Sequence, residues 1–315
     1  MKRFAVFACF ATLGLLPAHA ADKAAPSAAP AATPGSAKGG LRYTVTVTKF
    51  QNHSNYAGQF ALADTFGAVL TDSLLQSQRF IVIGESDMRT AAVAEQDFVA
   101  SGRTAGADKA PASGNMTPAQ LLVKGEITNF QDGTEGSNGN VGLGPLKLGS
   151  TSRTAEINAV IYFVDATTGQ VKASKKVVGQ VKSSSKSMGL TKGEMNGDLS
   201  SFKQTNVGKA MEVAVDQAVA FCVGQIENLP WSGNVILLKE DKIYFNRGQR
   251  EGVEVGQVFK VGISDILRDP GTGEVLDNNF TEKARIRVDT VKEKLSIGTI
   301  TSGGDVAKGM AVSPL

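Results

Sequence analysis

Cysteine, histidine and tryptophan are scarce in this chain of 315 residues, which holds two, two and one of them. Cys9 and His19 lie in an N-terminal stretch that we expect to be removed, which leaves Cys222 and His53. One cysteine cannot form an internal disulfide, and one cysteine with one histidine cannot build a Cys/His zinc site. A histidine-activated nucleophile would need His53, which lies in a polar run without a nucleophile signature. The sequence therefore favours no catalytic residue, no metal site and no cofactor.

Signatures for binding nucleotides or nucleic acids are also missing. The glycine-rich run GSNGNVG at 136–142 has neither the lysine nor the following helix that a phosphate-binding loop needs. The formal net charge is +3, and removal of Lys2 and Arg3 leaves about +1 (3 − 2). So small a charge gives no general attraction to nucleic acid or to anionic lipid. We therefore expect no nucleic-acid partner.

Long hydrophobic runs are limited to the N-terminus. Lys2 and Arg3 precede an apolar run at 4–16, which is too short to span a bilayer, and Ala18-His19-Ala20 follows as a small-x-small cleavage site. Residues 1–20 are thus predicted to be a secretory signal peptide, with the mature chain beginning near Ala21. Cys9 lies inside the apolar run and does not resemble a lipidation site. The predicted location is the periplasm.

The mature chain begins with a linker and continues with alternating helical and strand patterns. Residues 21–40 are rich in alanine and proline without periodicity, which is typical of disorder. Beyond them the patterns predict strand, helix, strand, helix and strand at 41–50, 58–78, 79–83, 85–100 and 121–130. The inner side of the second helix is expected to hold Met88, Ala92, Phe98 and Val99.

A hairpin at 155–174, AEINAVIYFVDATTGQVKAS, is predicted to form the centre of the sheet. Apolar and β-branched residues occupy both of its strand faces, so we expect both faces to be covered. Asp165 to Gly169 forms the turn, and 170–182 returns as the partner strand. A last helix at 206–226 packs Cys222 within its apolar stripe. The result is one α/β domain at 41–229, with the order β-α-β-α-β-β-β-α.

Two polar insertions, 131–154 and 183–203, interrupt this domain. Both exceed ordinary connections between packed elements. Residues 131–141, QDGTEGSNGNV, have almost no apolar side chain on either face, whereas a membrane strand needs about 9–11 residues with one apolar face. We therefore expect flexible loops or water-exposed hairpins, and a soluble or peripherally attached protein.

The spacing of the hydrophobic residues changes after Pro230-Trp231-Ser232-Gly233, from a helical pattern to a strand pattern. Residues 234–315 read as short strands separated by glycine turns. This pattern predicts a small all-β barrel or sandwich that follows the α/β domain and folds independently.

Four stretches of the first domain carry a family resemblance: LTDSLLQSQRFIVIGESDMRT, LLVKGEITNFQ, EINAVIYFVDATTGQVKAS and VGKAMEVAVDQAVAF. Together they resemble the curli production assembly/transport (CsgG-type) family over about 41–229. The resemblance implies export, rings at the outer membrane and passage of amyloid subunits. In channel-forming members the two insertions are membrane-spanning hairpins, and a loop after the first strand narrows the pore. Asn55 and Tyr56 are the candidates for such a constriction.

The sequence departs from that family in several ways. It lacks the lipidated cysteine, its loop at 51–58 is short, its hairpin segments are very polar, and its C-terminal domain is extra. The stretches YFNRGQREGVEVGQVFKVG and ARIRVDTVKEKLSIGTI make that domain similar to the C-terminal domain of flagellar assembly T-type proteins.

Three functions remain open. The favoured one is a non-enzymatic, ring-forming periplasmic component, peripheral to the outer membrane, of a secretion or surface-structure assembly system. Its partners would be copies of itself, secreted amyloid-type or surface-structure subunits and other envelope proteins. The second is a true curli-type secretion channel, and the third is an enzyme. The nearest acidic cluster is Asp64, Asp72, Glu85 and Asp87, which first-turn acids and a solvated helix face explain better. Glu126 and Glu156 are expected to face water or a neighbouring subunit.

Overall fold

The computed structural model describes residues 40–54, 61–105, 110–143, 146–186, 204–227, 229–273 and 275–315, and the side chains among them except those of 134–152 and 184–186. The predicted signal peptide, most of the linker, the constriction candidates Asn55 and Tyr56, and the greater part of the second insertion lie outside the described residues.

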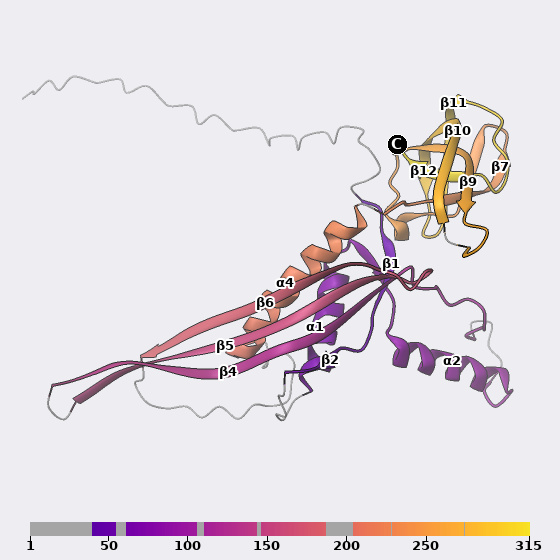
Figure 1. Ribbon diagram of the computed structural model, residues 1–315. Helices are drawn as coiled ribbons and strands as arrows, with labels where there is room; N and C mark the ends of the chain where they lie inside the picture. Colours follow the sequence, from indigo (N-terminus) through magenta and orange to yellow (C-terminus); the bar gives the residue numbers. More distant parts are fainter. Residues whose placement is uncertain are drawn as a thin grey trace, which may run out of the picture. The chain divides into compact units, whose positions relative to one another are not determined.

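Within the described residues, the first part of the chain is a mixed sheet with three helices. Its elements are β1 (Tyr43–Val47), β2 (Gln51–Asn52), α1 (Leu62–Gln76), β3 (Phe80–Val82), α2 (Ser86–Ala100), β4 (Leu121–Leu143), β5 (Leu146–Asp165), β6 (Val171–Lys186) and α4 (Asn206–Ile226). The strands lie in the order β3-β1-β4-β5-β6, and the two-residue β2 pairs with β4 (Figure 1). β1 pairs in parallel with β3 and β4, whereas β4, β5 and β6 are antiparallel. The predicted order is confirmed, with β2 added.

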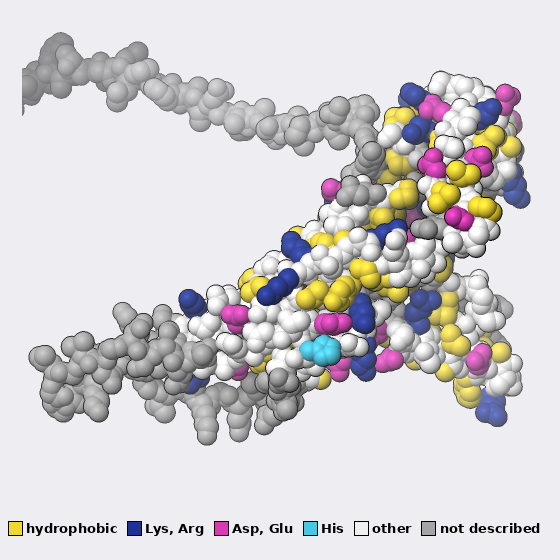
Figure 2. Space-filling model, viewed as in Figure 1, with side chains coloured by type: hydrophobic (Ala, Val, Ile, Leu, Met, Phe, Trp, Pro, Cys, Tyr) yellow, Lys and Arg dark blue, Asp and Glu magenta, His cyan; other side chains and the backbone are white. Residues whose placement is uncertain are grey.

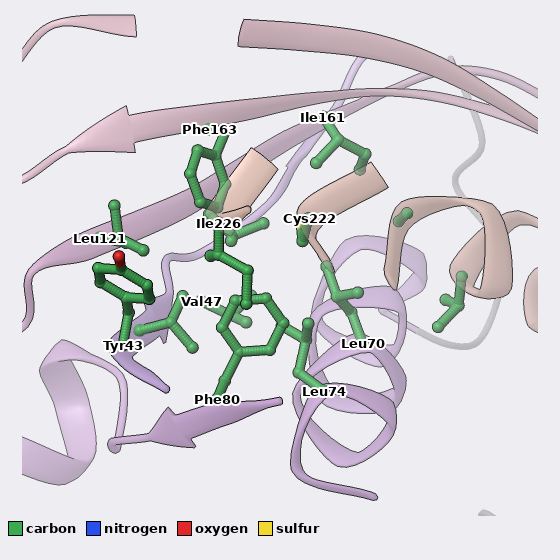
Figure 3. Packing of buried hydrophobic residues seen from close by; sticks show 14 of the residues in the cluster. Tyr43, Val47, Leu70, Leu74, Phe80, Leu121, Ile161, Phe163, Cys222 and Ile226 are labelled. Atoms are coloured by element: carbon green, nitrogen blue, oxygen red, sulfur yellow. The ribbon is translucent and has the colours of Figure 1, made fainter. Parts of the chain in front are cut away.

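One face of this sheet is buried under α1 and α4. Strand residues that point to this face, such as Val123, Ile157 and Phe163, are fully buried against the apolar stripes of the two helices. Figure 3 shows side chains from β1, β3, β4, β5 and both helices meeting in this core. The helix α4 approaches the sheet closely because of Gly179 in β6: a Cβ there would lie 1.7 Å from the carbonyl oxygen of Ala210 in α4. Cys222 is buried in α4, as predicted.

The other face of the sheet is only partly covered, which corrects the expectation that both faces are buried. Val160, Tyr162 and Val164 of β5 are half-buried, while their neighbours Ile161 and Phe163 have no exposed surface. Near β1 this face is closed by polar contacts, since Thr46 donates to the carbonyl oxygen of Gly84 over 3.0 Å. Alternation of apolar residues alone could not distinguish a strand covered on both faces from one with an apolar but open face.

The helix α2 forms where predicted but buries none of its side chains, so the predicted inner side is wrong. Met88 is 62% exposed and Phe98 is 46% exposed. The apolar residues of α2 are therefore not part of this chain's own core.

Of the two forms expected for the first polar insertion, a loop or a hairpin, the structure has the hairpin. β4 and β5 continue as a paired hairpin from Leu121↔Asp165 as far as Leu143↔Leu146, with register shifts between Ile127 and Asn129, Asp132 and Thr134, and Asn138 and Val141. The expected strand at 121–130 is thus 23 residues long. Backbone pairing between adjacent strands needs no apolar side chains, so the low strand preference of glycine did not prevent it.

The C-terminal part is a closed six-stranded barrel. Its strands are β7 (Gly233–Lys239), β8 (Lys242–Phe245), β9 (Val258–Arg268), β10 (Val275–Val291), β11 (Ser296–Gly303) and β12 (Ala311–Pro314), in the order β10-β11-β8-β7-β12-β9. A short 3-10 helix, η2 (Gln249–Glu251), follows β8. Trp231, ahead of β7, is 6% exposed and stacks on Phe259 at 5.4 Å between ring centroids. The prediction of a small all-β barrel is confirmed.

Candidate interaction surface

An apolar stripe runs along the open face of the sheet. We call it the β5 stripe and define it as Leu122, Val160, Tyr162, Val164 and Val178. The strand register makes these residues neighbours, because Leu122 lies opposite Val164, and Val178 lies on β6 opposite the β5 residue two before Val160. Figure 2 shows hydrophobic side chains at the surface among charged ones. A sheet face of this kind is suited to packing against another protein surface.

Charged residues flank the β5 stripe on both sides. Lys124 of β4 lies opposite Tyr162, and Glu126 of β4 and Lys176 of β6 lie opposite Val160. Charges at the margin of an apolar patch are typical of protein interfaces, where they fix orientation more than they add affinity.

A polar network continues this face along β5. The amide of Asn158 donates to Oε1 of Glu156 over 2.9 Å, and Gln180 of β6 donates to Oε2 of the same carboxylate over 3.1 Å. Asn158 is only 8% exposed, yet its Oδ1 has no hydrogen-bond donor within the described residues. An acceptor buried without a donor is costly, so a donor from a partner would stabilise this point of the face.

The helix α2 adds an unpartnered element beside the open face. Its residues Ser86, Arg89, Thr90 and Val93 line a largely apolar groove of about 490 Å³ whose remaining wall includes Leu122 of the β5 stripe. Val93 is 42% exposed. The groove and the stripe thus form one continuous apolar surface.

The outer edge of the sheet is β6, and α4 covers it at one point. The side-chain amide of Gln217 in α4 donates to the carbonyl oxygen of Val178 over 2.7 Å and accepts from its N–H over 3.2 Å. One side chain therefore satisfies both edge groups of this residue as a neighbouring strand would. This contact could not be predicted from the sequence, because Gln217 has the pattern of an ordinary polar position beside the apolar stripe of α4.

The acidic residues that the sequence grouped do lie together. Asp64, Asp72, Glu85 and Asp87 line one groove of about 550 Å³ beside α1 and the start of α2, together with Lys49 and several apolar side chains. Asp64 and Asp87 are first-turn acids of their helices, as expected. Glu126 and Glu156 are half-buried on the open face, on the side expected from the strand pattern.

Among the described residues, no group of three or more His, Cys, Asp or Glu side chains is arranged to hold a metal ion. Within the same residues, no helix is both long and apolar enough to cross a membrane. Burial raises the pKa of the Cys222 thiol to about 12, so this group is poorly suited to nucleophilic chemistry.

The model of the family "Curli production assembly/transport component CsgG" matches residues 32–247, which spans the whole sheet-and-helix part and extends through β8. This chain belongs to the CsgG family. No curated protein sequence matches it.

Several solved structures are similar to parts of this CsgG-family chain. A hypothetical protein of Chlamydia trachomatis is 14% identical, with 59% of this chain and 98% of that protein covered and a TM-score of 0.34. A PelC dodecamer from Paraburkholderia phytofirmans is 9% identical, with coverages of 56% and 86% and a TM-score of 0.29. The lipoprotein GNA1162 of Neisseria meningitidis is 16% identical, with coverages of 59% and 99% and a TM-score of 0.27.

Proposed function

We propose that this chain is a non-enzymatic component of a secretion or surface-structure assembly system, located in the periplasm and peripheral to the outer membrane. In this role copies of the chain associate into a ring through the sheet-and-helix part. Secreted amyloid-type or surface-structure subunits and other envelope proteins are the remaining partners. Membership of the CsgG family supports the assignment to assembly or transport.

The observation that carries self-association is the open apolar face of the sheet beside the unpartnered helix α2. The β5 stripe lacks a covering element among the described residues, and α2 buries none of its side chains. Within the described part of the chain, the β5 stripe lacks a covering helix, and α2 lacks a surface to pack against. A helix packs well on the apolar face of a sheet. Among the described residues, the groove beside α2 includes Thr46 and Leu122 of its own sheet, and Leu122 is the one member of the β5 stripe that lines it. We therefore assign the rest of the stripe to α2 of a neighbouring copy, an arrangement that repeats head to tail and closes into a ring.

Fractionation tests the location. We expect the native protein to leave the membrane fraction during carbonate extraction, because a peripheral component is held by protein contacts. Retention in the membrane after carbonate treatment, with release only by detergent, would contradict a peripheral component.

The second candidate is a curli-type secretion channel, and the long hairpin of β4 and β5 is the observation that favours it. Both strands continue, paired, as far as Leu143 and Leu146, in the segment that corresponds to a membrane-spanning hairpin in channel-forming relatives. Against it stands the polar sequence of 131–141, which has almost no apolar side chain to face lipid and contains the acids Asp132 and Glu135. A charged side chain facing lipid is destabilising, by about 2–4 kcal/mol for lysine or arginine at the bilayer midplane and by less for an acid.

Planar-bilayer recording separates the two candidates. For the proposed scaffold we expect no discrete conductance from the mature protein, purified with or without detergent. Reproducible steps that vanish on deletion of 131–154 would establish the channel instead.

A further inference from the structure

A small pocket with an excess of arginine lies outside the candidate interaction surface. It has a volume of about 210 Å³, and its charged lining consists of Arg42, Arg247, Arg250 and Glu251. Three positive groups and one negative group give a formal sum of +2. The backbone N–H of Arg42 donates to the carbonyl oxygen of Glu251 over 2.9 Å, which holds the β1 end of the chain against η2.

The single carboxylate, Glu251, is already hydrogen-bonded through both of its oxygens. Its Oε1 accepts from Nε of Arg250 over 2.8 Å and from Nη2 over 2.6 Å, and its Oε2 accepts from the backbone N–H of Gly248 over 2.8 Å. Glu251 is 5% exposed, so this arrangement is fixed inside the protein. Arg250 and Glu251 thus neutralise each other and leave two cations in the pocket.

Arg42 and Arg247 are the two cations without a carboxylate. Within the described residues neither makes an ion pair, and Nε of Arg42 is buried without an acceptor. Burial lowers the pKa of Arg247, with the nearby charge of Glu251 opposing this effect and that of Arg250 adding to it. Burying a cation without a counter-charge is unfavourable. An anion bound here would offset the free-energy cost of burying these guanidinium groups.

A neutral donor in the same wall is also without an acceptor. Trp231 lines the pocket, is 6% exposed, and its indole Nε1 has no hydrogen-bond partner within the described residues. The guanidinium carbon of Arg247 lies 6.0 Å from the centroid of its ring. Arg247 donates from Nη1 to the carbonyl oxygen of Asn246 over 3.1 Å, which leaves its other N–H groups available. Two guanidiniums without an ion pair and an indole N–H without an acceptor are all suited to the same kind of ligand atom, a negatively charged oxygen.

We propose that this pocket binds an oxyanion of about the size of a phosphate group. The planar forks of Arg42 and Arg247 match the oxygens of a phosphate, and Nε1 of Trp231 supplies a further donor. The volume is below the 300–1,000 Å³ that is usual for drug-sized ligands, so a group of a few atoms fits rather than a whole nucleotide. The oxyanion comes either from free phosphate or from the headgroup of an anionic phospholipid.

The fluorescence of Trp231 reports directly on this pocket, because the chain contains a single tryptophan. The experiment uses the chain from Ala21 onward at pH 7 and titrates inorganic phosphate while chloride holds the ionic strength constant. We expect a saturable change in the tryptophan emission. Arg42→Gln should raise the phosphate concentration for half-saturation about tenfold, because it removes charge-assisted hydrogen bonds.

Two further variants control for folding and for general charge. Arg42→Lys keeps the charge but loses the fork, so it should weaken binding less than Arg42→Gln and remain informative if the latter fails to fold. Arg268→Gln is the matched control, because Arg268 is exposed on β9 and donates to the carbonyl oxygen of Gly273 over 3.1 Å. It should leave the titration unchanged.

A parallel titration distinguishes the two sources of the oxyanion. Vesicles of phosphatidylglycerol are compared with vesicles of phosphatidylcholine in the same assay. A saturable response to phosphate, or to phosphatidylglycerol alone, supports the proposal and identifies the source. No saturable response to either, or an equal response in the parent chain, Arg42→Gln and Arg268→Gln, overturns it.

Discussion

Single residues determine how closely the helices approach the sheet. Gly179 lets α4 lie against β6, since any side chain there would meet the backbone of Ala210. Gly224, in the same helix, has open space where a Cβ would be placed. The two glycines look alike in the sequence, because only the packed structure shows which of them faces another backbone.

The first prediction compares these two positions. Gly179→Ala should destabilise the protein by about 1–3 kcal/mol or more, because the helix must move to accept the methyl group. Gly224→Ala should stabilise it by about 0.5–1 kcal/mol, because alanine is the better helix former. Urea unfolding of both variants measures the difference. Equal stabilities for the two would mean that α4 does not contact β6 at this point.

Cys222 gives a second test at the residue scale. With its pKa raised to about 12, the thiol is ionised to only about one part in ten thousand at pH 8, and it is also buried. In the chain from Ala21 onward, a thiol-specific reagent should react slowly under native conditions and rapidly in denaturant. Its native reaction rate should rise as the pH approaches 12. Rapid native labelling at pH 8 would show that the α4 core opens readily.

At the scale of elements, the sequence predicted which helices and strands form, and in what order, better than it predicted what covers their faces. The stripe of α4 and the strands of the barrel were recognisable because each buries one face at a regular period. Two predictions were wrong: that α2 has a buried inner side and that both faces of β5 are covered. The apolar residues at both places face a partner or solvent instead. The length of β4 was missed because its pairing depends on the backbone of β5.

The edge of β6 gives the third prediction. Gln217→Ala removes both hydrogen bonds to Val178, so we expect a loss of about 0.5–1.5 kcal/mol per bond and faster aggregation through the opened strand edge. Gln225→Ala is the matched control in the same helix. Urea unfolding and light scattering over time measure the two effects. If the two alanine variants behave alike, Gln217 does not protect the edge.

At the scale of the whole molecule, the boundary of the C-terminal barrel can be refined. The sequence placed it at 234, but Trp231 stacks on Phe259 inside the barrel. The candidate constriction residues Asn55 and Tyr56 and the second insertion remain sequence-based predictions. Nothing in the sequence brought Arg42, Trp231 and Arg247 together, since they are far apart along the chain.

The fourth prediction concerns that boundary. A fragment of residues 231–315 should fold cooperatively, while one of residues 234–315 should be less stable by about 3–5 kcal/mol, because it lacks the large side chain that covers Phe259. Circular dichroism during urea unfolding compares the two. Failure of both fragments to fold would mean that the barrel depends on the preceding part of the chain.

Self-association through the open sheet face is the central claim, and the mass of the mature protein in solution tests it most directly. Light scattering on the chain from Ala21 onward, with and without detergent, should give a mass several times that of one chain. Val160→Arg, in the β5 stripe, should lower that mass towards one chain without unfolding the protein, whereas Thr290→Arg, at an exposed position of β10, should leave it unchanged. A strict monomer at high concentration under both conditions, or an unchanged assembly in Val160→Arg, would contradict the claim.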